Sequence, residues 1–521
     1  MRTLVIVEGS GKTAKLENSL RKLGIHAQVV ATLGHICENP QSLENIALDE
    51  SLRETAYTVR SDRVELLGRM RVMASEADRI YLATDDDQEG NVIAADVAAH
   101  LPGCESKLYR ARLRALSEDE LSKTFVAAAP TSLTALRADA RQGDCRRVID
   151  RAIGATFSEL STHFYAGRIQ SALLSHIAAT QVPYGDFTLT LDLEGKDYYC
   201  TLPVFSPGNA AAYEQLQAAL DSVRLAGISA PVVEDVSVSS PWGFEDVLIA
   251  ASERLGLDIE TVEHGFQEAY ERGRVSYPRA RANAFSADAI GLGESLAAAN
   301  RCQFVSGLLP VRNDVHHVDF PHESPRPLDE DLVLGRPLSL LDTPDAIAVL
   351  VARNFLLCGQ KAKKRSVEVE CGGNRLLFSR LENVPRKGWQ DPPRKIGLQI
   401  FSRERALLRF MSERDLGRPS TVVGHIKKFL SRDLIAATDA VRLTDRGRLW
   451  EKKCAELGLT KEIAKQVENS IARLPYDKSA QDGACDILKA HALYEPVSRK
   501  IREQSAAQAQ PQEVGLYGAN G

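Results

Sequence analysis

The first part of the chain alternates between short apolar runs and amphipathic stretches, and this alternation limits the fold more than any other feature. The predicted strands are "TLVIVEG", "HAQVVATLGH" and "RIYLAT", and the predicted helices are "GKTAKLENSLRKLG", "DRVELLGRMRVMASEA" and "NVIAADVAAHL". Short strands separated by amphipathic helices are typical of an α/β domain with a mostly parallel sheet. We therefore expect such a domain at the beginning of the chain.

Two of the predicted strands end in acidic residues. Glu8 follows the first strand, and Asp85, Asp87 and Glu89 follow the strand that ends at Thr84. Ligands of open α/β sheets bind outside the carboxyl ends of the strands, and alternate residues of an extended turn point the same way. Carboxylates with open positions suit Mg²⁺. A solvated acidic turn at a helix start and a general acid/base cluster are the alternatives.

Composition sets broad limits on the class of protein. A chain of 521 residues is too long for one hydrophobic core and should form roughly three or four domains. The nine cysteines never form CxxC, which fits a reducing cytoplasm rather than zinc ribbons or a disulfide framework. We find no signal peptide and no apolar run that could span a bilayer. With a net charge of −5, binding to nucleic acid would need a local basic surface.

The remainder of the chain changes pattern several times. Residues 140–180 look helical, period-two β patterns begin at "DFTLTLDLEGKDYYCTLPVF", and a helical block covers 244–273. β patterns return near 366–405, and the last hundred or so residues are mainly helical. The turn "VEGSGKT" is too short for a GxxxxGK[ST] phosphate loop, so no ATP binding is inferred.

Nine segments resemble, in the same order, the motifs of the type IA DNA topoisomerases, which contain a Toprim domain. They are "LVIVEGSGKTAK", "VVATLGHI", "ATDDDQEGN", "YRARLRALSEDEL", "CRRVIDRAIGATFS", "YAGRIQSALL", "ERGRVSYPRARA", "PHESPRPL" and "GRPSTVVGHIKKFLSRDLI". One motif alone would mean little, because a lone Tyr-Pro or Gly-Arg-Pro-Ser-Thr is usually structural. Their order along most of the chain makes coincidence very improbable.

The resemblance implies roles for single residues. The nucleophile would be Tyr277, which attacks a DNA phosphate and needs nearby cations because its ordinary pKa is about 10. The other implied catalytic residues are Glu8 as proton donor and Lys12, Arg279 and His322 at the phosphate. The implied DNA-binding residues are His35, Arg110, Arg147, Arg168, Gln170 and Arg326. The implied Mg²⁺ ligands are Asp85, Asp87, Glu89 and Glu8.

The resemblance also implies a multidomain fold, mixed α/β plus α and β, with a Rossmann-like Toprim domain in a toroidal core of four domains. The Toprim domain would comprise 1–32 and 56–130, and a helical single-strand-binding domain 33–55, 131–178 and 406–502. A β-rich arch would comprise 179–241 and 336–405, with the tyrosine domain at 242–335 and a disordered tail at 503–521. Separate domains would let the tyrosine lift from the acidic residues and open a gate.

The implied activity is cleavage of single-stranded DNA, strand passage and religation, dependent on Mg²⁺ and independent of ATP. The DNA would be single-stranded segments of negatively supercoiled duplex in the cytoplasm, at the nucleoid. The sequence departs from the family at Asp86, Gln88 and Asn91, where the family has proline, arginine and glutamate. It also lacks cysteine pairs for C-terminal zinc ribbons, so a protein partner would replace that region. The alternative is a cleavage-impaired relative that binds single-stranded DNA without catalysis.

Overall fold

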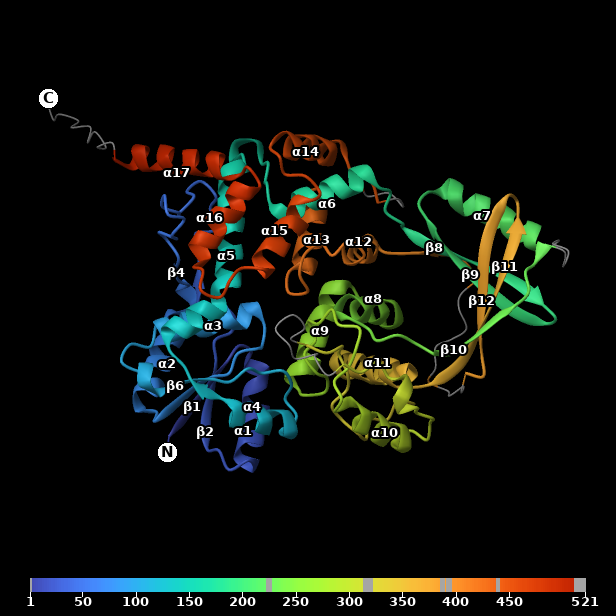
Figure 1. Cartoon of the computed structure of the whole chain (residues 1–521), viewed down its shortest axis with the longest axis horizontal. Coiled ribbons are helices and arrows are strands. Elements are labelled where there is room, and N and C mark those ends of the chain that lie inside the picture. The colour runs from blue at the N-terminus through green and yellow to red at the C-terminus, as the bar shows by residue number, and fades with distance from the viewer. Residues whose placement is uncertain are drawn as a thin grey trace, which may run out of the picture.

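A computed structural model describes residues 2–221, 227–312, 322–384, 389, 396–436 and 441–509. Figure 1 shows three regions: an α/β unit at the N-terminus, helices that lie above and beside it, and a β sheet at the far end. Two separate connections run to that sheet, one from α12 and one from α8 and α11. The multidomain mixed α/β fold is therefore confirmed.

The N-terminal sheet has the strand order β2-β1-β5-β6-β7, and all neighbours are parallel except β6 and β7. Its strands are β1 (Thr3–Val7), β2 (Ala27–Ala31), β5 (Arg79–Leu82), β6 (Leu108–Arg110) and β7 (Ala129–Pro130). Leu4 and Ile6 pack on the side of α2 (Val64–Glu76) and α3 (Gln88–Ala99). Val5 and Val7 pack on the side of α1 (Thr13–Lys22) and α4 (Glu118–Ala127). The apolar run of β1 is continuous because both faces of the sheet are covered.

A helical body follows, and a single hydrophobic core holds it together. Its helices are α5 (Leu133–Phe157), α6 (Arg168–Ala179), α12 (Arg403–Ser412), α13 (Val422–Ser431), α14 (Asp445–Glu456), α15 (Ile463–Ala472), α16 (Ala480–Ala490) and α17 (Tyr494–Ala509). The segment with β3 (Cys37–Glu38) and β4 (Thr58–Val59) has no helix of its own, but Ile46 and Leu52 join this core. Arg151 of α5 also binds the backbone carbonyls of Pro40 and Ile46.

The second sheet has the strand order β10-β11-β12-β9-β8-β13, and its pairs are antiparallel. Its strands are β8 (Gly185–Leu193), β9 (Lys196–Val204), β10 (Val232–Ser237), β11 (Lys361–Cys371), β12 (Asn374–Glu382) and β13 (Gly397–Ile400). One face packs on α7 (Pro207–Leu220) through Phe187 and Phe378. The period-two patterns of the sequence follow this one-sided burial.

Between the two sheets lie α8 (Phe244–Leu255), α9 (Ile259–Glu271), α10 (Ala289–Ala299) and α11 (Thr343–Cys358). The predicted boundary at 336 needs correction, because α11 packs on α8, α9 and α10 rather than on the β sheet. The reason is its apolar sequence, "TPDAIAVLVARNFLLC", which is buried on nearly all sides. In addition, α8 and α9 contribute to the same core as the helical body. The other predicted domain boundaries stay predictions.

The predicted disordered tail also needs correction at its start. Helix α17 continues to Ala509, and Val497 and Ile501 are buried in the helical core. The Gln504 side chain accepts a hydrogen bond of 2.8 Å from the Ile46 backbone N–H, which ties the helix to the segment before α5. The prediction for 510–521 lies outside the described residues.

Candidate active site and nucleic-acid groove

Tyr277 lies in the segment after α9 and contacts the acidic turn of the N-terminal sheet. Its side chain is buried, and the phenol donates a hydrogen bond of 2.5 Å to Oδ2 of Asp87. The segment is fixed by Ser276, whose backbone N–H donates to the Arg326 carbonyl at 2.9 Å. The His322 ring stacks on the Tyr277 ring with centroids 4.0 Å apart, and its Nε2 has no hydrogen-bond partner among the described residues. The structure therefore joins the predicted nucleophile to the predicted acidic cluster.

The Tyr270 phenol and the Lys12 ammonium group both contact the neighbouring carboxylate, that of Asp85. Lys12 Nζ lies 2.5 Å from Oδ1 of Asp85, and the Tyr270 hydroxyl donates to the same oxygen at 3.0 Å. Lys12 is 1% exposed and lies 4.6 Å from the centre of the Tyr270 ring. β1 and β5 are adjacent and parallel, so the residues that follow them meet at one edge of the sheet. The structure thus brings Lys12 and Asp85 together, and their catalytic roles stay predictions.

The buried charges shift several pKa values. Burial and the charges of Asp87 and Asp85 raise the pKa of Tyr277 well above its usual value, although Arg279 lowers it. Burial and the charge of Asp85 raise the pKa of Glu8 to about 7. Burial opposes the charge of Arg279, but the nearby Tyr277 and Glu8 outweigh that effect and raise its pKa. In this arrangement the phenol carries its proton.

The predicted metal ligand Glu89 does not share the partners of Asp85 and Asp87. Helix α3 begins at Gln88, so the turn is not extended as far as Glu89, and the Asp87 side chain caps the helix by accepting from Gly90 N–H at 2.7 Å. Glu89 instead pairs with His35 at 2.6 Å. Burial raises the pKa of Glu89, but the hydrogen bond with His35 and the charges of His35 and Arg418 lower it to about 2.

The carboxylates offer the oxygen ligands that Mg²⁺ prefers, and they would have to release protein partners to hold it. Asp85, Asp87 and Glu89 are each engaged by protein groups. Among the described residues, no three or more His, Cys, Asp or Glu side chains form a group that could hold a metal ion. The predicted four-ligand Mg²⁺ site is not formed in this closed state.

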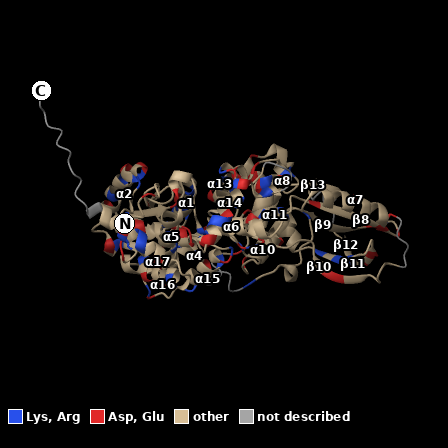
Figure 2. Cartoon of the chain, turned by 90° about the horizontal axis from the view of Figure 1, so that it is seen from above, with Lys and Arg blue, Asp and Glu red and all other residues tan. Residues whose placement is uncertain are grey.

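A groove of about 580 Å³ runs from Glu89 across α6, α13 and α15. Six cationic residues line it, against four acidic ones: Arg146, Arg168, Arg281, Arg418, Lys428 and Lys465, with Glu89, Asp150, Asp415 and Glu468. Figure 2 shows basic ribbon segments near α6, α8 and α13. Arg418 Nη1 is buried without a hydrogen-bond partner among the described residues, and its ion pair with Glu89 is long, at 3.7 Å. The groove can thus take an anion at Arg418.

Two predicted DNA-binding residues lie at or beside this groove. Arg168 is buried and held by Asp150 at 3.0 Å and by Glu468 at 3.2 Å. Gln170 donates to the Tyr165 carbonyl at 2.5 Å and accepts from Arg432. Their contact with DNA stays a prediction.

Two other predicted DNA-binding residues have structural partners instead. Arg110 is 8% exposed and donates to the backbone carbonyls of Leu82, Thr84 and Ala111, so it holds the turn after β5. Arg147 does not line the groove, because it pairs with Glu54 and lies on the ring of Tyr57. It is the preceding residue, Arg146, that lines the groove.

The sequence analysis did not select Arg146, Arg418, Tyr270 or Arg114, which all lie at the site. Arg146 and Arg418 lie within the motifs quoted above, but the sequence did not indicate which arginine of "CRR" lines the groove. Tyr270 lies seven residues, about two helical turns, before Tyr277, and the two rings meet edge to face at 5.7 Å. Proximity to the acidic turn is a tertiary property that the local pattern did not reveal.

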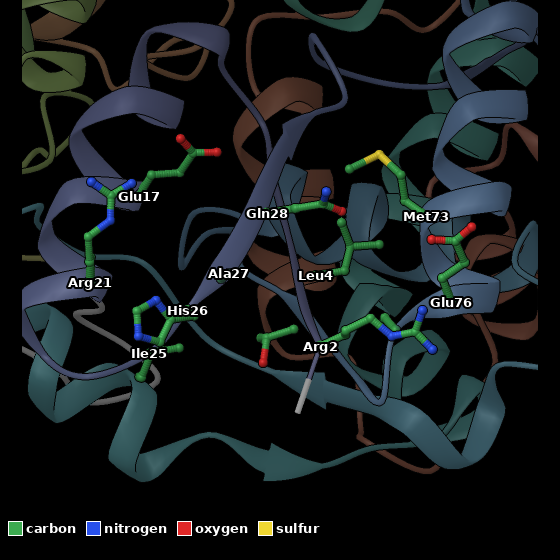
Figure 3. Close-up of a pocket in the computed structure, with 12 residues that line it drawn as sticks. Arg2, Leu4, Glu17, Arg21, Ile25, His26, Ala27, Gln28, Met73 and Glu76 are labelled. Atoms are coloured by element: carbon green, nitrogen blue, oxygen red, sulfur yellow. The ribbon is translucent and has the colours of Figure 1, made fainter.

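A further cavity of about 370 Å³ lies at the opposite end of the N-terminal sheet. Figure 3 shows Arg2, Glu17, Arg21, His26 and Glu76 around it, near the beginnings of β1 and β2. None of the predicted site residues lines it. Within the described part of the chain, no helix has both the length and the apolar character that a bilayer crossing requires.

Comparison with known proteins agrees with this geometry. The model of the Toprim domain matches residues 3–116, so the N-terminal unit is similar to a Toprim domain. "DNA topoisomerase 1" of Campylobacter jejuni is 24% identical over 99% of this chain and 81% of the relative. "DNA topoisomerase 1" of Pseudomonas aeruginosa is 25% identical over 83% of this chain and 59% of the relative. The chain therefore spans only about three-fifths of the length of the latter.

A solved structure extends the likeness to the whole fold. Full-length topoisomerase I from Thermotoga maritima matches with a TM-score of 0.62 and 17% identity, covering 97% of this chain and 90% of that one. At this identity the match shows the fold alone. Together with the Toprim match, the relatives and this structure show that the chain is similar to DNA topoisomerase 1 proteins along most of its length.

Proposed function

We propose that the chain cleaves single-stranded DNA through a covalent bond to Tyr277, allows a strand to pass, and reseals the break. The observation that carries this proposal is the 2.5 Å hydrogen bond between Tyr277 and Asp87, two residues 190 positions apart. A phenol buried against an acidic turn, with Lys12 and Arg279 nearby, has the groups that phosphoryl transfer to a tyrosine needs.

The chemistry balances with the residues of this chain. The Tyr277 oxygen attacks the phosphorus, the phenolic proton passes to Asp87, and the bond from phosphorus to the deoxyribose 3′ oxygen breaks. Glu8 gives its proton to the leaving oxygen, a role supported by its pKa of about 7. Resealing reverses these steps, and the phosphotyrosine keeps the energy of the broken bond, so no ATP is consumed.

We further propose that the groove lined by Arg146, Arg168 and Arg418 binds the single strand. Arginines contact phosphates through their N–H groups, and single-strand grooves combine positive charge with stacking. Arg418 supports this role because it lines the groove and its Nη1 makes no hydrogen bond to a described residue, only a long ion pair with Glu89 at 3.7 Å. Glu89 borders the groove and follows Asp87 closely in the chain, so a strand in the groove would end near Tyr277.

Strand passage requires the tyrosine segment to separate from the acidic turn. The contacts to break are Tyr277 with Asp87 and Tyr270 with Asp85. Mg²⁺ as cofactor stays a prediction, since the carboxylates are engaged in the closed arrangement. Action together with a protein partner, and action on nucleoid DNA in the cytoplasm, are also proposals.

Relaxation of a negatively supercoiled plasmid tests the proposal. We expect relaxation with Mg²⁺ and without ATP, loss of it in EDTA, and loss of it in Tyr277→Phe. Tyr270→Phe is the matched control, because it removes the neighbouring hydroxyl and keeps the nucleophile. Full relaxation by Tyr277→Phe would refute the assignment.

The non-catalytic alternative has one specific observation in its favour: the closed acidic turn holds no group of three metal-binding side chains among the described residues. A protein of that kind would bind a single-stranded oligonucleotide tightly and form no covalent product. The same plasmid assay separates the two functions, because a binding factor relaxes nothing.

A further inference from the structure

A small pocket beside Tyr277 contains an arginine that the proposed reaction has not yet used. Arg114 lines this pocket together with Ser276, Tyr277, His322 and Arg326. Arg114 comes from the segment after β6, whereas Ser276 and Tyr277 come from the segment after α9. His322 and Arg326 come from the segment that meets it at the isolated bridge between Pro327 and Val275. The pocket therefore lies where the two parts of the active site meet.

Arg114 is held at one end only. Its Nε donates to Oδ2 of Asp86 at 2.7 Å, and the Asp86 side chain is 10% exposed. No hydrogen bond joins either Nη group of Arg114 to another residue in the described part of the chain. The Arg114 side chain is 31% exposed and lines the pocket.

Asp86 is itself fixed by a network that includes two positions where the sequence departs from the family. Its Oδ1 lies 3.4 Å from Nη1 of Arg112, and the same nitrogen donates to Asn91 at 2.9 Å. Arg112 is anchored further by Asp139 at 2.7 Å. Asp86 and Asn91, together with Arg112, thus form a support for Arg114.

The opposite wall of the pocket repeats this arrangement. Arg326 donates through Nε to Glu323 at 2.8 Å, and Glu323 also accepts from Ser286. The acidic residue Asp288 of the same pocket pairs with Lys123. Two guanidinium groups therefore border one pocket, and each is held through Nε by its own carboxylate.

We propose that Arg114 binds a phosphate oxygen of the nucleic acid beside Tyr277, facing Arg326 across the pocket, with Asp86 as its positioning residue. A guanidinium held at Nε presents its remaining N–H groups as a planar fork, which matches the oxygens of a phosphate. In this role Arg114 supplies a positive charge at the site. The family has an arginine at the position of Gln88, and this chain lacks that charge. The inference rests on the proposed function of Tyr277. A contact with Glu120, an acidic residue of the same pocket, is the competing explanation.

The test measures DNA binding and covalent capture separately. Binding of a fluorescent single-stranded oligonucleotide is measured by anisotropy at several salt concentrations, in the Tyr277→Phe background so that no cleavage occurs. Covalent capture is measured as the denaturant-resistant product with Tyr277 intact. The variants are Arg114→Ala, Arg114→Lys and Asp86→Asn, and the matched control is Arg21→Ala, at the cavity of Figure 3 on the opposite end of the same sheet.

We expect Arg114→Ala to weaken binding by about tenfold and to reduce the slope of log affinity against log salt by about 0.7, the value for one phosphate contact on a single strand. Covalent capture should fall as well, and Arg114→Lys should restore the salt slope but only part of the capture. Asp86→Asn should lower capture more than binding, since it leaves the Arg114 charge in place but loosens it. Arg21→Ala should change neither readout.

Unchanged binding, salt slope and capture in Arg114→Ala would overturn the proposal and favour the pairing with Glu120. Thermal unfolding identifies a variant that is misfolded, and in that case Arg114→Lys decides. If the parent protein captures no DNA at all, the function proposed for Tyr277 fails. The salt slope of the binding experiment still decides whether Arg114 contacts a phosphate.

Discussion

The pocket around Tyr277 and the groove lined by Arg146 and Arg418 are neighbours, but they differ in how closely protein partners engage their charged side chains. Around Tyr277, the carboxylates of Asp85 and Asp87 have partners within 3.0 Å, and Lys12 is almost fully buried. In the groove, the lining leaves a volume of about 580 Å³, and Arg418 keeps a nitrogen without a hydrogen bond to any described residue. The acidic turn beside Tyr277 is engaged by protein groups, whereas the groove is open.

This difference indicates an order of events. If the groove binds a single strand as proposed, Arg168 and Arg146 need no rearrangement, since Asp150 and Glu468 already position them. The Tyr277 pocket must exchange protein hydrogen bonds for substrate ones before it can react. Substitutions around Tyr277 should therefore act mainly on stability and substitutions in the groove on DNA binding or pH dependence, and four variants test this, in order of decreasing effect.

Lys12→Ala should have the largest effect on stability. The substitution leaves the buried carboxylate of Asp85 without its cation, and breaking a buried pair in this way costs about 3–5 kcal/mol. The free energy of unfolding, from urea titration, measures the loss. Lys15→Ala, an exposed lysine of the next helix, is the control and should change it by less than about 0.5 kcal/mol. A loss no larger than that of Lys15→Ala would show that the pocket is not closed around Lys12.

Arg418→Ala should act on DNA rather than on stability. Loss of a charged hydrogen bond to a phosphate should weaken binding of a single-stranded oligonucleotide by roughly tenfold to a hundredfold, measured by anisotropy at fixed salt. The exposed Arg403→Ala, at the start of α12, is the matched control. If both variants bind equally well, the groove does not hold the strand at Arg418.

Acid should lower the free energy of unfolding through Glu468, which lines the groove. Burial raises its pKa, but Arg146, Arg168 and Arg418 outweigh burial and lower it to about 2. A carboxyl whose pKa is depressed in the folded state contributes stability above its unfolded value, near 4.5, and loses it as the pH falls toward 2. The side chain is 35% exposed, so solvent screening limits the effect to roughly 1 kcal/mol. Unfolding of wild type and Glu468→Gln between pH 5 and pH 2 should converge at low pH, and parallel curves would contradict this.

The smallest effect concerns the glycine turn after β1. A Cβ at Gly11 would lie 2.1 Å from Oε2 of Glu271 and 2.9 Å from its Cβ, so this turn leaves room for a side chain of α9. Gly11→Ala should destabilise the protein by about 1 kcal/mol, because Glu271 can move only partly. The double variant Gly11→Ala/Glu271→Ala should recover the part of the loss caused by the carboxylate, whereas the Cβ contact at 2.9 Å remains, as a thermal unfolding scan would show. Equal loss in the single and double variants would assign it to the backbone instead.

Much of the fold follows from periodicity in the sequence. The continuous apolar run of β1 predicts a strand covered on both faces, and the alternation in β8 and β9 predicts a sheet covered on one face; the structure has both. The boundary at 336 was wrong because apolar periodicity shows that α11 is buried but not which element buries it. Partner choice of that kind is set by tertiary packing.

The candidate site was predictable only in part. Lys12 and Asp85 were recognisable because their motifs follow predicted strands. Tyr277 was recognisable because its motif resembles one of the family's motifs. Glu89 was misplaced because helix α3 begins one residue after Asp87, and a helix start can shift by a residue without changing the pattern. Arg114 gave no signal, since its role depends on Asp86, which is distant in sequence.

Capture of a cleaved oligonucleotide on Tyr277 tests the central claim most directly. A single-stranded oligonucleotide is incubated with the protein, the reaction is stopped with denaturant, and the attached peptide is identified by mass spectrometry. We predict that the 5′ phosphate of the downstream fragment is joined to Tyr277, and that Tyr277→Phe yields no such product. Attachment at another residue, or unbroken oligonucleotide with tight binding retained, would contradict the account.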